Sequence, residues 1–273
     1  MASPLRIHLP SLALLVTALG ASCEDPAPTK GAPTAEKATA AQALAPAPKV
    51  ESPTPSAASP EPAEPTLEKK PVVCAPGSKV AFSDAALEAE VRRKAGKLEG
   101  ELSLADLRKV RSVDLTRGAG KLESLDPCVF PKLTSLHHLY LGGGTLTDLS
   151  PLKGLTKLEG LRISMNPVTD ISPLAGMIQM DRLDLGRTQI RDLKPLKGMT
   201  KMTELMLDDT PVDDVSALAG LTKLERLSIK RTRVTDVSPL RSLTKLKFLY
   251  VGGSPVENPG AAARPGLKIS DEE

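Results

Sequence analysis

Residues 158–179 read LEGLRISMNPVTDISPLAGMIQ, and residues 224–245 repeat the same pattern as LERLSIKRTRVTDVSPLRSLTK. Both stretches belong to a series of units of 22 residues, of which five are complete and a sixth is partial. The units begin at Leu136, Leu158, Met180, Met202, Leu224 and Leu246. A fixed period of this length predicts one structural element that is repeated along the chain.

The unit that begins at Met202 shows why such units must stack. Its regularly placed apolar side chains are Met202, Leu205, Leu207, Val212, Val215, Leu218 and Leu221. Leu205 and Leu207 are separated by Met206, and this alternation predicts a short strand with two different faces. A single unit buries too little apolar surface to offset the conformational entropy of its residues, so neighbouring units must share their apolar faces and pair their strands.

The spacing L-x-x-L-x-L-x-x-N within the units is the signature of leucine-rich repeats. The predicted fold class is an α/β-type solenoid, in which short parallel strands form the concave face of an arc. Only Asn166 keeps the final Asn of the motif, and the other units have Gly144, Thr188, Thr210, Thr232 and Ser254 there. The Thr and Ser hydroxyls can still bond the backbone of the turn, although with fewer groups than an amide.

The second half of each unit contains signals for a turn and for the start of a helix. Ser150, Ser172 and Ser238 each precede a Pro, which predicts that these Ser residues cap short helices with Pro at the first helical position. Two positions earlier the units have Asp148, Asp170, Asp192, Asp214 and Asp236. We expect these carboxylates to accept backbone N–H bonds in the turn.

The short unit and its T-D-[IVL]-S-P-L segment resemble the internalin-type class of bacterial leucine-rich repeats, over about residues 80–257. Residues 82–115 look like the capping helix and the first irregular strand that are common in such proteins. The resemblance implies a solenoid with a binding role, but it does not identify the ligand.

In this entry segment, Ser83 is placed to cap the helix, and Leu87 and Val91 form an apolar pair one turn apart. Val113 matches Leu139 in the pattern but precedes it by 26 residues. An insertion therefore interrupts the first unit.

Residues 1–22 have the features of a secretory signal peptide, because Arg6 precedes an apolar run that ends in small residues before Cys23. This run is too short to span a bilayer. The position of Cys23 resembles a bacterial lipoprotein signal, which implies that this Cys is acylated; the alternative is cleavage that releases a soluble protein. Residues 23–71 are rich in Pro and Ala and predict a disordered tether.

Cys74 and Cys128 remain as a pair if Cys23 carries lipid. In an exported protein we expect them to form a disulfide. The bridge would tie the end of the tether to the first irregular unit and cover the open apolar end of the stack.

Composition and motifs argue against several classes of function. The net charge is +3, and the chain has 3 Phe, 2 Tyr and no Trp, which argues against a nucleic-acid-binding module. The sequence has no G-x-S-x-G, H-E-x-x-H or G-x-x-x-x-G-K-[ST] motif. A solenoid also leaves its carboxylates on open slopes, where burial cannot raise a pKa. We therefore predict no catalytic residues, no cofactor and no metal site, with His137 and His138 as ordinary surface side chains.

The expected strand register indicates which side chains lie on the concave face, namely the third, fifth, seventh and eighth positions of each unit. The predicted partner-binding residues are Tyr140, Arg162, Arg182, Asp184, Arg187, Glu204, Met206, Asp208, Arg226, Lys230, Phe248 and Tyr250. Tyr and Arg are enriched among binding hot spots, so we predict a protein partner of unknown identity. Phe248 and Tyr250 have an alternative role, which is to cover the last unit.

These expectations divide the chain into a signal peptide (1–22), a lipidated Cys and tether (23–71), an N-terminal cap with an irregular first repeat (72–135), the repeats (136–257) and a polar tail (258–273). We predict a monomer in the bacterial cell envelope, either in the periplasm or at the cell surface, anchored to a membrane through Cys23.

The alternative function is an envelope spacer that binds polysaccharide or peptidoglycan or associates with itself. Its basis is a series of Lys residues directly before the units, at Lys157, Lys201, Lys223 and Lys245. Charges at the stacking interval would suit an anionic polymer. An enzyme is the least favoured interpretation.

Overall fold

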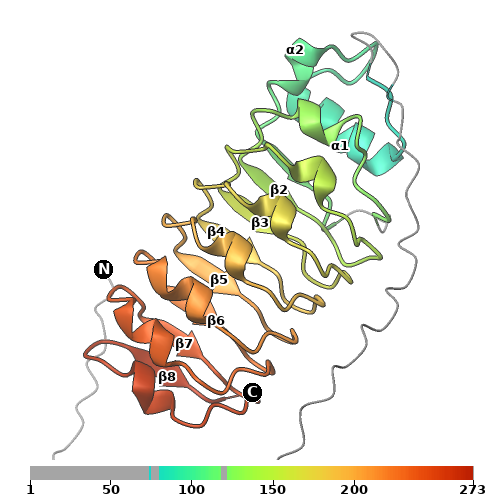
Figure 1. The fold of residues 1–273 in the computed structure, drawn as a ribbon. Coiled ribbons are helices and arrows are strands. Elements are labelled where there is room, and N and C mark those ends of the chain that lie inside the picture. Colours follow the sequence, from blue (N-terminus) through green and yellow to red (C-terminus); the bar gives the residue numbers. More distant parts are fainter. Residues whose placement is uncertain (1–73, 75–79, 118–121, 273) are drawn as a thin grey trace, which may run out of the picture. The chain divides into compact units, whose positions relative to one another are not determined.

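The computed structural model describes residue 74, residues 80–117 and residues 122–272. The predicted signal peptide, Cys23 and the tether lie outside the described residues. Within the described part, eight strands form one parallel sheet in the order of the sequence (Figure 1). The strands are β1 Ser112–Asp114, β2 His138–Tyr140, β3 Gly160–Arg162, β4 Arg182–Asp184, β5 Glu204–Met206, β6 Arg226–Ser228, β7 Phe248–Tyr250 and β8 Lys268–Ser270.

The strands pair in a register that aligns equivalent residues of successive units. The aligned central residues are Leu139, Leu161, Leu183, Leu205, Leu227 and Leu249. This alignment confirms the predicted solenoid. Val113 of β1 lies opposite Leu139, so the insertion in the first unit leaves the sheet continuous.

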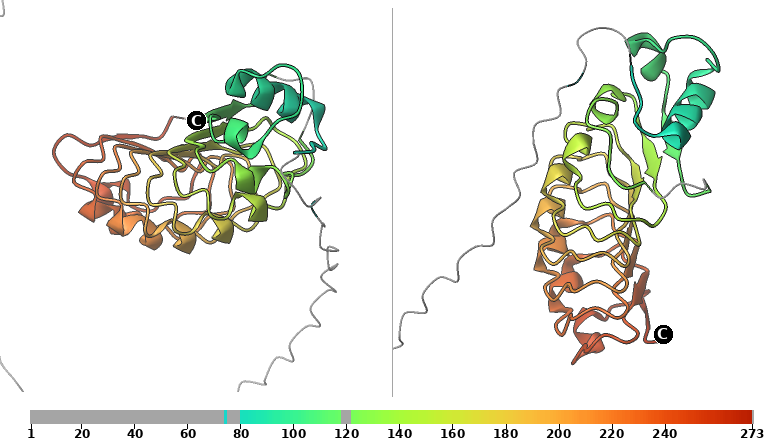
Figure 2. Two further views of the ribbon diagram at one scale, coloured as in Figure 1. Left: turned by 90° about the horizontal axis from the view of Figure 1, so that it is seen from above. Right: turned by 90° about the vertical axis from the view of Figure 1, so that its right-hand side faces the viewer.

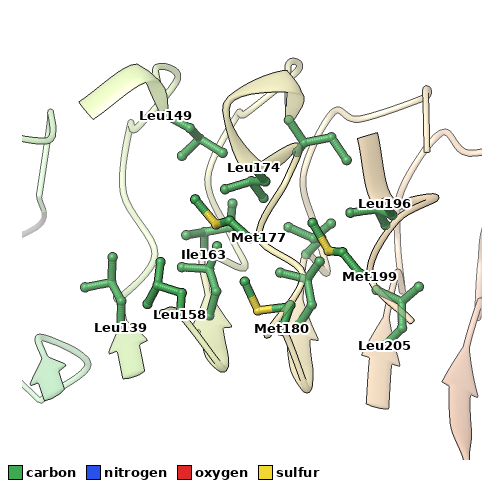
Figure 3. Packing of buried hydrophobic residues seen from close by; sticks show 14 of the residues in the cluster. Leu139, Leu149, Leu158, Ile163, Leu174, Met177, Met180, Leu196, Met199 and Leu205 are labelled. Carbon is green, nitrogen blue, oxygen red and sulfur yellow. The ribbon is translucent and has the colours of Figure 1, made fainter. Parts of the chain in front are cut away.

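The apolar positions of all units form one continuous core between the strands and the opposite side of the stack (Figure 3). Met177, Met180 and Met199 occupy positions that other units fill with Leu, and each is at most 1% exposed. The unbranched Met side chain adapts to gaps of irregular shape, so these substitutions leave the stack unbroken.

A row of short 3-10 helices lies on the side of the stack opposite the strands (Figure 2). They are η1 Phe130–Lys132, η2 Ser150–Leu152, η3 Ser172–Leu174, η4 Lys194–Leu196, η5 Ser216–Gly220, η6 Ser238–Ser242 and η7 Pro259–Ala262. Paired strands are about 4.8 Å apart. Because helical turns need more room than paired strands, the stack bends with the sheet on its concave face.

Aspartate, and not serine, organises the starts of these 3-10 helices. In each unit the Asp Oδ1 accepts the backbone N–H of the residue two positions later, at 2.7 to 2.9 Å. The predicted role of the Asp residues is therefore confirmed. The predicted role of Ser as a cap is wrong, because Ser150, Ser172 and Ser238 are themselves the first helical residues. The Ser172 hydroxyl instead donates to Asp170 Oδ2 at 2.8 Å.

Helices α1 (Ala85–Ala95) and α2 (Leu104–Leu107) cover the N-terminal end of the sheet (Figure 1). The N-cap of α1 is Asp84, whose Oδ1 accepts the N–H of Leu87 at 2.6 Å, so the prediction that Ser83 caps this helix is wrong. Leu87 and Val91 are fully buried, as their spacing indicated.

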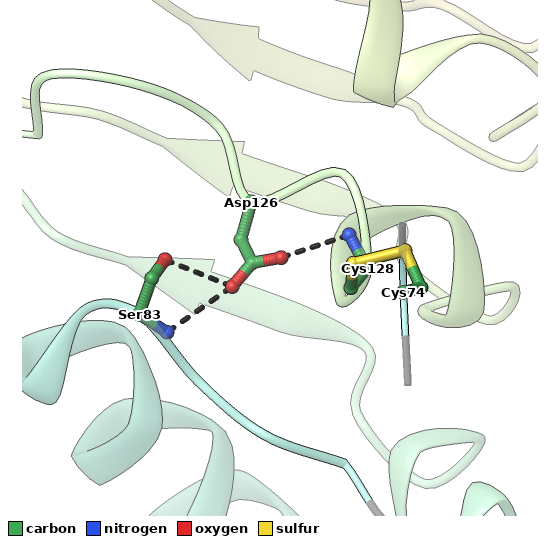
Figure 4. Close-up of a disulfide and its surroundings, with 4 residues drawn as sticks. All are labelled: Cys74, Ser83, Asp126 and Cys128. Carbon is green, nitrogen blue, oxygen red and sulfur yellow. Dashed lines mark hydrogen bonds between the residues drawn. A yellow bond between two sulfur atoms is a disulfide. The ribbon is translucent and has the colours of Figure 1, made fainter. Parts of the chain in front are cut away.

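Ser83 binds a distant carboxylate instead. Its amide and hydroxyl both donate to Asp126 Oδ2, while Asp126 Oδ1 accepts the N–H of Cys128 at 2.8 Å (Figure 4). Cys128 forms a disulfide with Cys74, and the two Cα atoms are 5.4 Å apart. These bonds hold the segment before α1 against the loop that leads into η1.

The C-terminal residues extend the sheet beyond the 22-residue period. Residues 258–273, which the sequence pattern describes only as a polar tail, contain η7 and the strand β8, which pairs with β7. Ile269 lies opposite Leu249 although the two are only 20 residues apart, so the repeat pattern does not reveal this strand.

Arg264 attaches this C-terminal segment to the preceding unit. Its guanidinium donates to the backbone carbonyls of Leu240, Arg241 and Leu246, at 3.3, 3.4 and 3.1 Å. Partial burial lowers the pKa of this guanidinium. No helix in residues 80–117 and 122–272 has the length and apolar character needed to cross a membrane.

Candidate protein-binding face

The outward-pointing side chains of β2–β7 form two parallel rows across the concave face. The first row, at the third position of each unit, consists of His138, Gly160, Arg182, Glu204, Arg226 and Phe248. The second row, at the fifth position, consists of Tyr140, Arg162, Asp184, Met206, Ser228 and Tyr250. Neighbours in a row are about 4.8 Å apart, so their side chains can touch.

Two ion pairs join neighbours within these rows. Arg226 Nη1 lies 3.3 Å from Glu204 Oε1 in the first row. In the second row, Arg162 Nε lies 3.2 Å from Asp184 Oδ2. Because the cations are about half exposed, such pairs contribute at most about 1 kcal/mol each to stability. Their main effect is to orient side chains on the open surface.

An aromatic cluster with cations around it lies at the C-terminal end of the rows. The rings of Phe248 and Tyr250 stack with centroids 6.4 Å apart. Arg226 lies 5.5 Å from the centroid of Phe248, and Lys230 lies 5.7 Å from that of Tyr250. Lys268 of β8 lies 5.8 Å from the Phe248 centroid on the other side. Cations at these distances are attracted to the ring faces.

A third group lies in the turns that follow the strands, at the eighth position. Asp209 accepts hydrogen bonds from Arg187 and Arg231, and these cations hold the pKa of its carboxyl below the usual range, with the Arg231 bond as the larger cause. Four residues here have a left-handed backbone with φ from 49° to 62°: Met165, Arg187, Asp209 and Arg231. This conformation is costly for residues other than Gly, Asn and Asp, and it recurs at the same position of successive units because each turn must leave its strand in the same direction.

Two shallow depressions lie on the concave face and share Arg182 and Glu204. One has a volume of about 190 Å³ and is lined by Tyr140, Leu161, Arg162, Arg182, Leu183, Asp184, Glu204 and Met206. The other has a volume of about 330 Å³ and is lined by Arg182, Thr203, Glu204, Glu225, Arg226 and Phe248. The first volume is below the lower limit of ordinary ligand pockets, and the second is close to it. The two depressions therefore suit individual side chains of a partner.

The His, Cys and acidic side chains of the described residues are the groups that a metal site or an acid catalyst would use. No group of three His, Cys, Asp or Glu side chains in the described ranges is arranged to hold a metal ion. His137 Nδ1 contacts the carbonyl oxygen of Ser135 at 2.7 Å, whereas His138 Nδ1 lies 3.5 Å from the Tyr140 hydroxyl, so the two neighbours face different groups. Where carboxyl pKa values are shifted in this part of the chain, hydrogen bonds and cations lower them, which is unfavourable for a general acid at neutral pH.

The structure brings the predicted partner-binding residues together on one face. Nine of the twelve lie on the strands, and Arg187, Asp208 and Lys230 follow strand ends in the turns. Asp208 accepts hydrogen bonds from the Ser228 hydroxyl and the Lys230 amide. Sequence reasoning missed Lys268, because β8 is out of period; the alternation in Leu267-Lys268-Ile269 is the only local signal for this strand.

Comparisons with known proteins agree with the repeat fold. A family model described as leucine-rich repeats (2 copies) matches residues 134–176. Internalin C2 from Listeria monocytogenes is 29% identical with a TM-score of 0.61, and the match covers 69% of this chain and 94% of that chain. No curated protein is significantly similar in sequence.

Two further solved structures match less of their own length. An internalin (InlF) from Listeria monocytogenes is 28% identical with a TM-score of 0.53, and the match covers 66% of this chain and 59% of that chain. A leucine-rich-repeat protein from Leptospira interrogans is 18% identical with a TM-score of 0.53, and the match covers 60% of this chain and 50% of that chain. The latter likeness concerns the fold alone. The protein is thus a leucine-rich-repeat solenoid whose structure is similar to those of Listeria internalins.

Proposed function

We propose that this protein is an exported, lipid-anchored recognition module that binds a protein partner through its concave face. The observation that carries the proposal is the pair of in-register rows on β2–β7, which present Arg, Asp, Glu and aromatic side chains on one open surface. Repeat proteins commonly bind other proteins on extended concave surfaces of this kind. Arg and Tyr are also the residue types most often found in binding hot spots.

Charge reversal on the concave face tests the binding. The full chain is used as bait on cell-envelope extracts, in its original form and with Arg182→Glu and Arg226→Glu together. The matched control reverses Lys153 and Lys197, which are exposed after η2 and η4 on the opposite side of the stack. We expect a captured protein to be lost with the concave variant and kept with the control. Equal capture by both variants would contradict binding through this face.

The same extracts test the spacer alternative. Lys157, Lys201, Lys223 and Lys245 are all exposed, and Lys201 donates to Gln179, which stands in the same position one unit earlier. This edge favours an anionic polymer as a second candidate ligand. Retention on purified envelope polysaccharide that survives reversal of Arg182 and Arg226, but not of these Lys residues, would support the spacer.

The proposed anchor has a separate test. Its support is the apolar run that ends at Cys23 and the Pro- and Ala-rich stretch that follows. An acylated Cys with more than one chain would hold the protein on a membrane durably. We expect Cys23→Ala to move the protein from the membrane fraction to the soluble one, with Cys23→Ser as a second variant. Continued membrane fractionation of both would refute lipid anchoring.

A further inference from the structure

Basic side chains outnumber acidic ones on the concave face. At the third, fifth, seventh and eighth positions of the units on β2–β7, six side chains are basic and four are acidic. The basic ones are Arg162, Arg182, Arg187, Arg226, Lys230 and Arg231, and the acidic ones are Asp184, Glu204, Asp208 and Asp209.

All four acidic side chains are already bonded within the protein. Asp184 accepts from Arg162 and from the Ser164 hydroxyl, and Glu204 pairs with Arg226. Asp209 pairs with two arginines, while Asp208 accepts from the Ser228 hydroxyl and from a backbone amide. Arginines of the same face therefore offset the charges of Asp184, Glu204 and Asp209, and this weakens their attraction for a basic partner.

Three cations retain their capacity to bind. The Arg182 side chain is 70% exposed, and its ion pair with Asp181 is long, at 3.7 Å. Lys230 and Lys268 contact the faces of Tyr250 and Phe248, and neither pairs with a carboxylate of the described ranges. A cation on an aromatic face can still bind an incoming anion from its open side.

These three cations form two sites with an acidic band between them. Arg182 is on β4, and the aromatic cluster with Lys230 and Lys268 is centred on β7, three strands away, or about 14 Å at the usual strand spacing. Glu204, together with the two Asp residues of the same unit, lies between these sites. Within this band Asp208 is bonded by a hydroxyl and a backbone amide and so keeps its charge. A uniformly charged anionic polymer would bring its own charges against Asp208, whereas a protein segment can place acidic groups only at the two ends.

We propose that the concave face binds an acidic segment of the partner protein, with one carboxylate at Arg182 and a second at the Lys230–Lys268 site over the rings of Phe248 and Tyr250. This inference rests on the proposed function and adds the chemical class of the partner. A guanidinium fits a carboxylate through two parallel hydrogen bonds, so Arg182 is the more specific of the two sites. An extended chain covers about 14 Å in about four residues, so the two acidic residues are separated by four or five positions.

The test uses a phage-displayed library of random 12-residue peptides, selected on the immobilised full chain. We expect the enriched peptides to contain acidic residues four or five positions apart.

Affinity measurements with variants then test the two sites. Synthetic copies of the enriched peptides should bind Arg182→Gln at least tenfold more weakly than the original chain. The double variant Lys230→Gln with Lys268→Gln should show the same loss. The control is Lys153→Gln with Lys197→Gln, which removes the same charge as the double variant. We expect it to leave the affinity unchanged. Neutral Gln avoids repulsion in the rows, and thermal unfolding of each variant verifies the fold.

The outcomes separate this inference from the proposed function. Peptides that lose affinity with Tyr250→Ala but have no acidic excess would overturn the inference and leave binding through the concave face intact. Peptides that bind all concave variants equally, or a failure to enrich any peptide, would overturn the inference, whereas the proposed function fails only if capture from the envelope extracts is unaffected by the concave variant. If dextran sulfate binds as tightly as the peptides and depends on the same cations, the occupant is a polyanion and the inference is wrong.

Discussion

At the scale of single residues, one buried amide joins two units in a way that the hydroxyl in the next unit does not. Asn166 is 2% exposed; it accepts the N–H of Leu146 and donates to the carbonyl of Gly142, both in the preceding unit, as well as to Ile163 in its own unit. Thr188, in the same position of the next unit, donates only to the carbonyl three residues earlier. Thr188 and Thr210 thus bond the turn with fewer groups than Asn166, whereas the Ser254 hydroxyl also reaches the preceding unit at Ile229 and Thr232.

Removing the Asn166 amide should therefore be costly. We expect Asn166→Ala to lower the free energy of unfolding by about 3 kcal/mol, because several buried backbone groups lose their partner. Asn166→Thr should lose less, since a hydroxyl can keep the bond within the unit, and Thr188→Ala should cost about 1 kcal/mol. Urea unfolding of the three variants measures this. If Asn166→Thr is as stable as the original chain, the bonds to the preceding unit contribute nothing.

The ion pairs of Asp209 should make the stability of the protein depend on pH. The folded pKa of this carboxyl is lower than its unfolded value of about 3.9, so the stabilisation is fully present above about pH 4 and is lost as the pH falls through the folded pKa. We expect Asp209→Asn to lower the Tm more at neutral pH than at about pH 2, because the carboxyl of the folded protein gains protons as the pH falls. Asn also tolerates the left-handed backbone, so the variant isolates the charge. Thermal unfolding at both pH values decides this, and an equal difference at both would contradict it.

At the scale of elements, the 3-10 helices η2–η6 each begin with an Asx turn. The Asp carboxylate bonds a backbone N–H, and this bond needs no particular side chain at the next position, as Lys194 after Asp192 shows. The Pro that follows most of these positions has a fixed φ that suits the first helical residues. The turn therefore tolerates the replacement of the Ser, whereas the Asp is present in all five of these units.

A pair of variants in η3 tests this order. We expect Asp170→Ala to cost about 1 kcal/mol of unfolding free energy, because the Ser172 amide loses its acceptor. Ser172→Ala should cost less, since it removes only the hydroxyl bond and keeps the bond from the amide. Asp170→Asn, which retains an acceptor oxygen, is the matched control. A larger loss with Ser172→Ala than with Asp170→Ala would show that the hydroxyl is the important group.

The N-terminal cap depends on a covalent link between segments 54 residues apart. Opening this loop releases chain entropy in the unfolded state, so the double variant Cys74→Ser with Cys128→Ser should lose about 4 kcal/mol. Urea unfolding with and without a reducing agent measures the loss. The reducing agent should bring the original chain to the stability of the double variant and leave that variant unchanged. A double variant with unchanged stability would show that the bridge is not formed in solution.

At the scale of the whole molecule, stability is the sum of units and of the interfaces between them. Met180 is fully buried in the middle of the stack, so Met180→Ala should lower the free energy of unfolding by about 2 to 5 kcal/mol. Met180→Leu keeps most of the volume and should cost less than about 1.5 kcal/mol. Calorimetry should show a single transition for both variants. Two separate transitions in Met180→Ala would mean that the two halves of the stack unfold independently.

The sequence by itself determined the stack and most of its concave face. The apolar positions recur every 22 residues, and strict translation of one unit onto the next leaves a single register, so Tyr140, Arg162 and Tyr250 could be assigned to one row in advance. Only the tertiary structure revealed the residues that depart from the regular repeat. Ser83 donates to Asp126, 43 residues later, while Asp84 caps the helix. Lys268 joins the face through a strand outside the period. Which cations of the face pair with carboxylates was likewise decided only by the fold, because these ion pairs join side chains about one unit apart in the sequence.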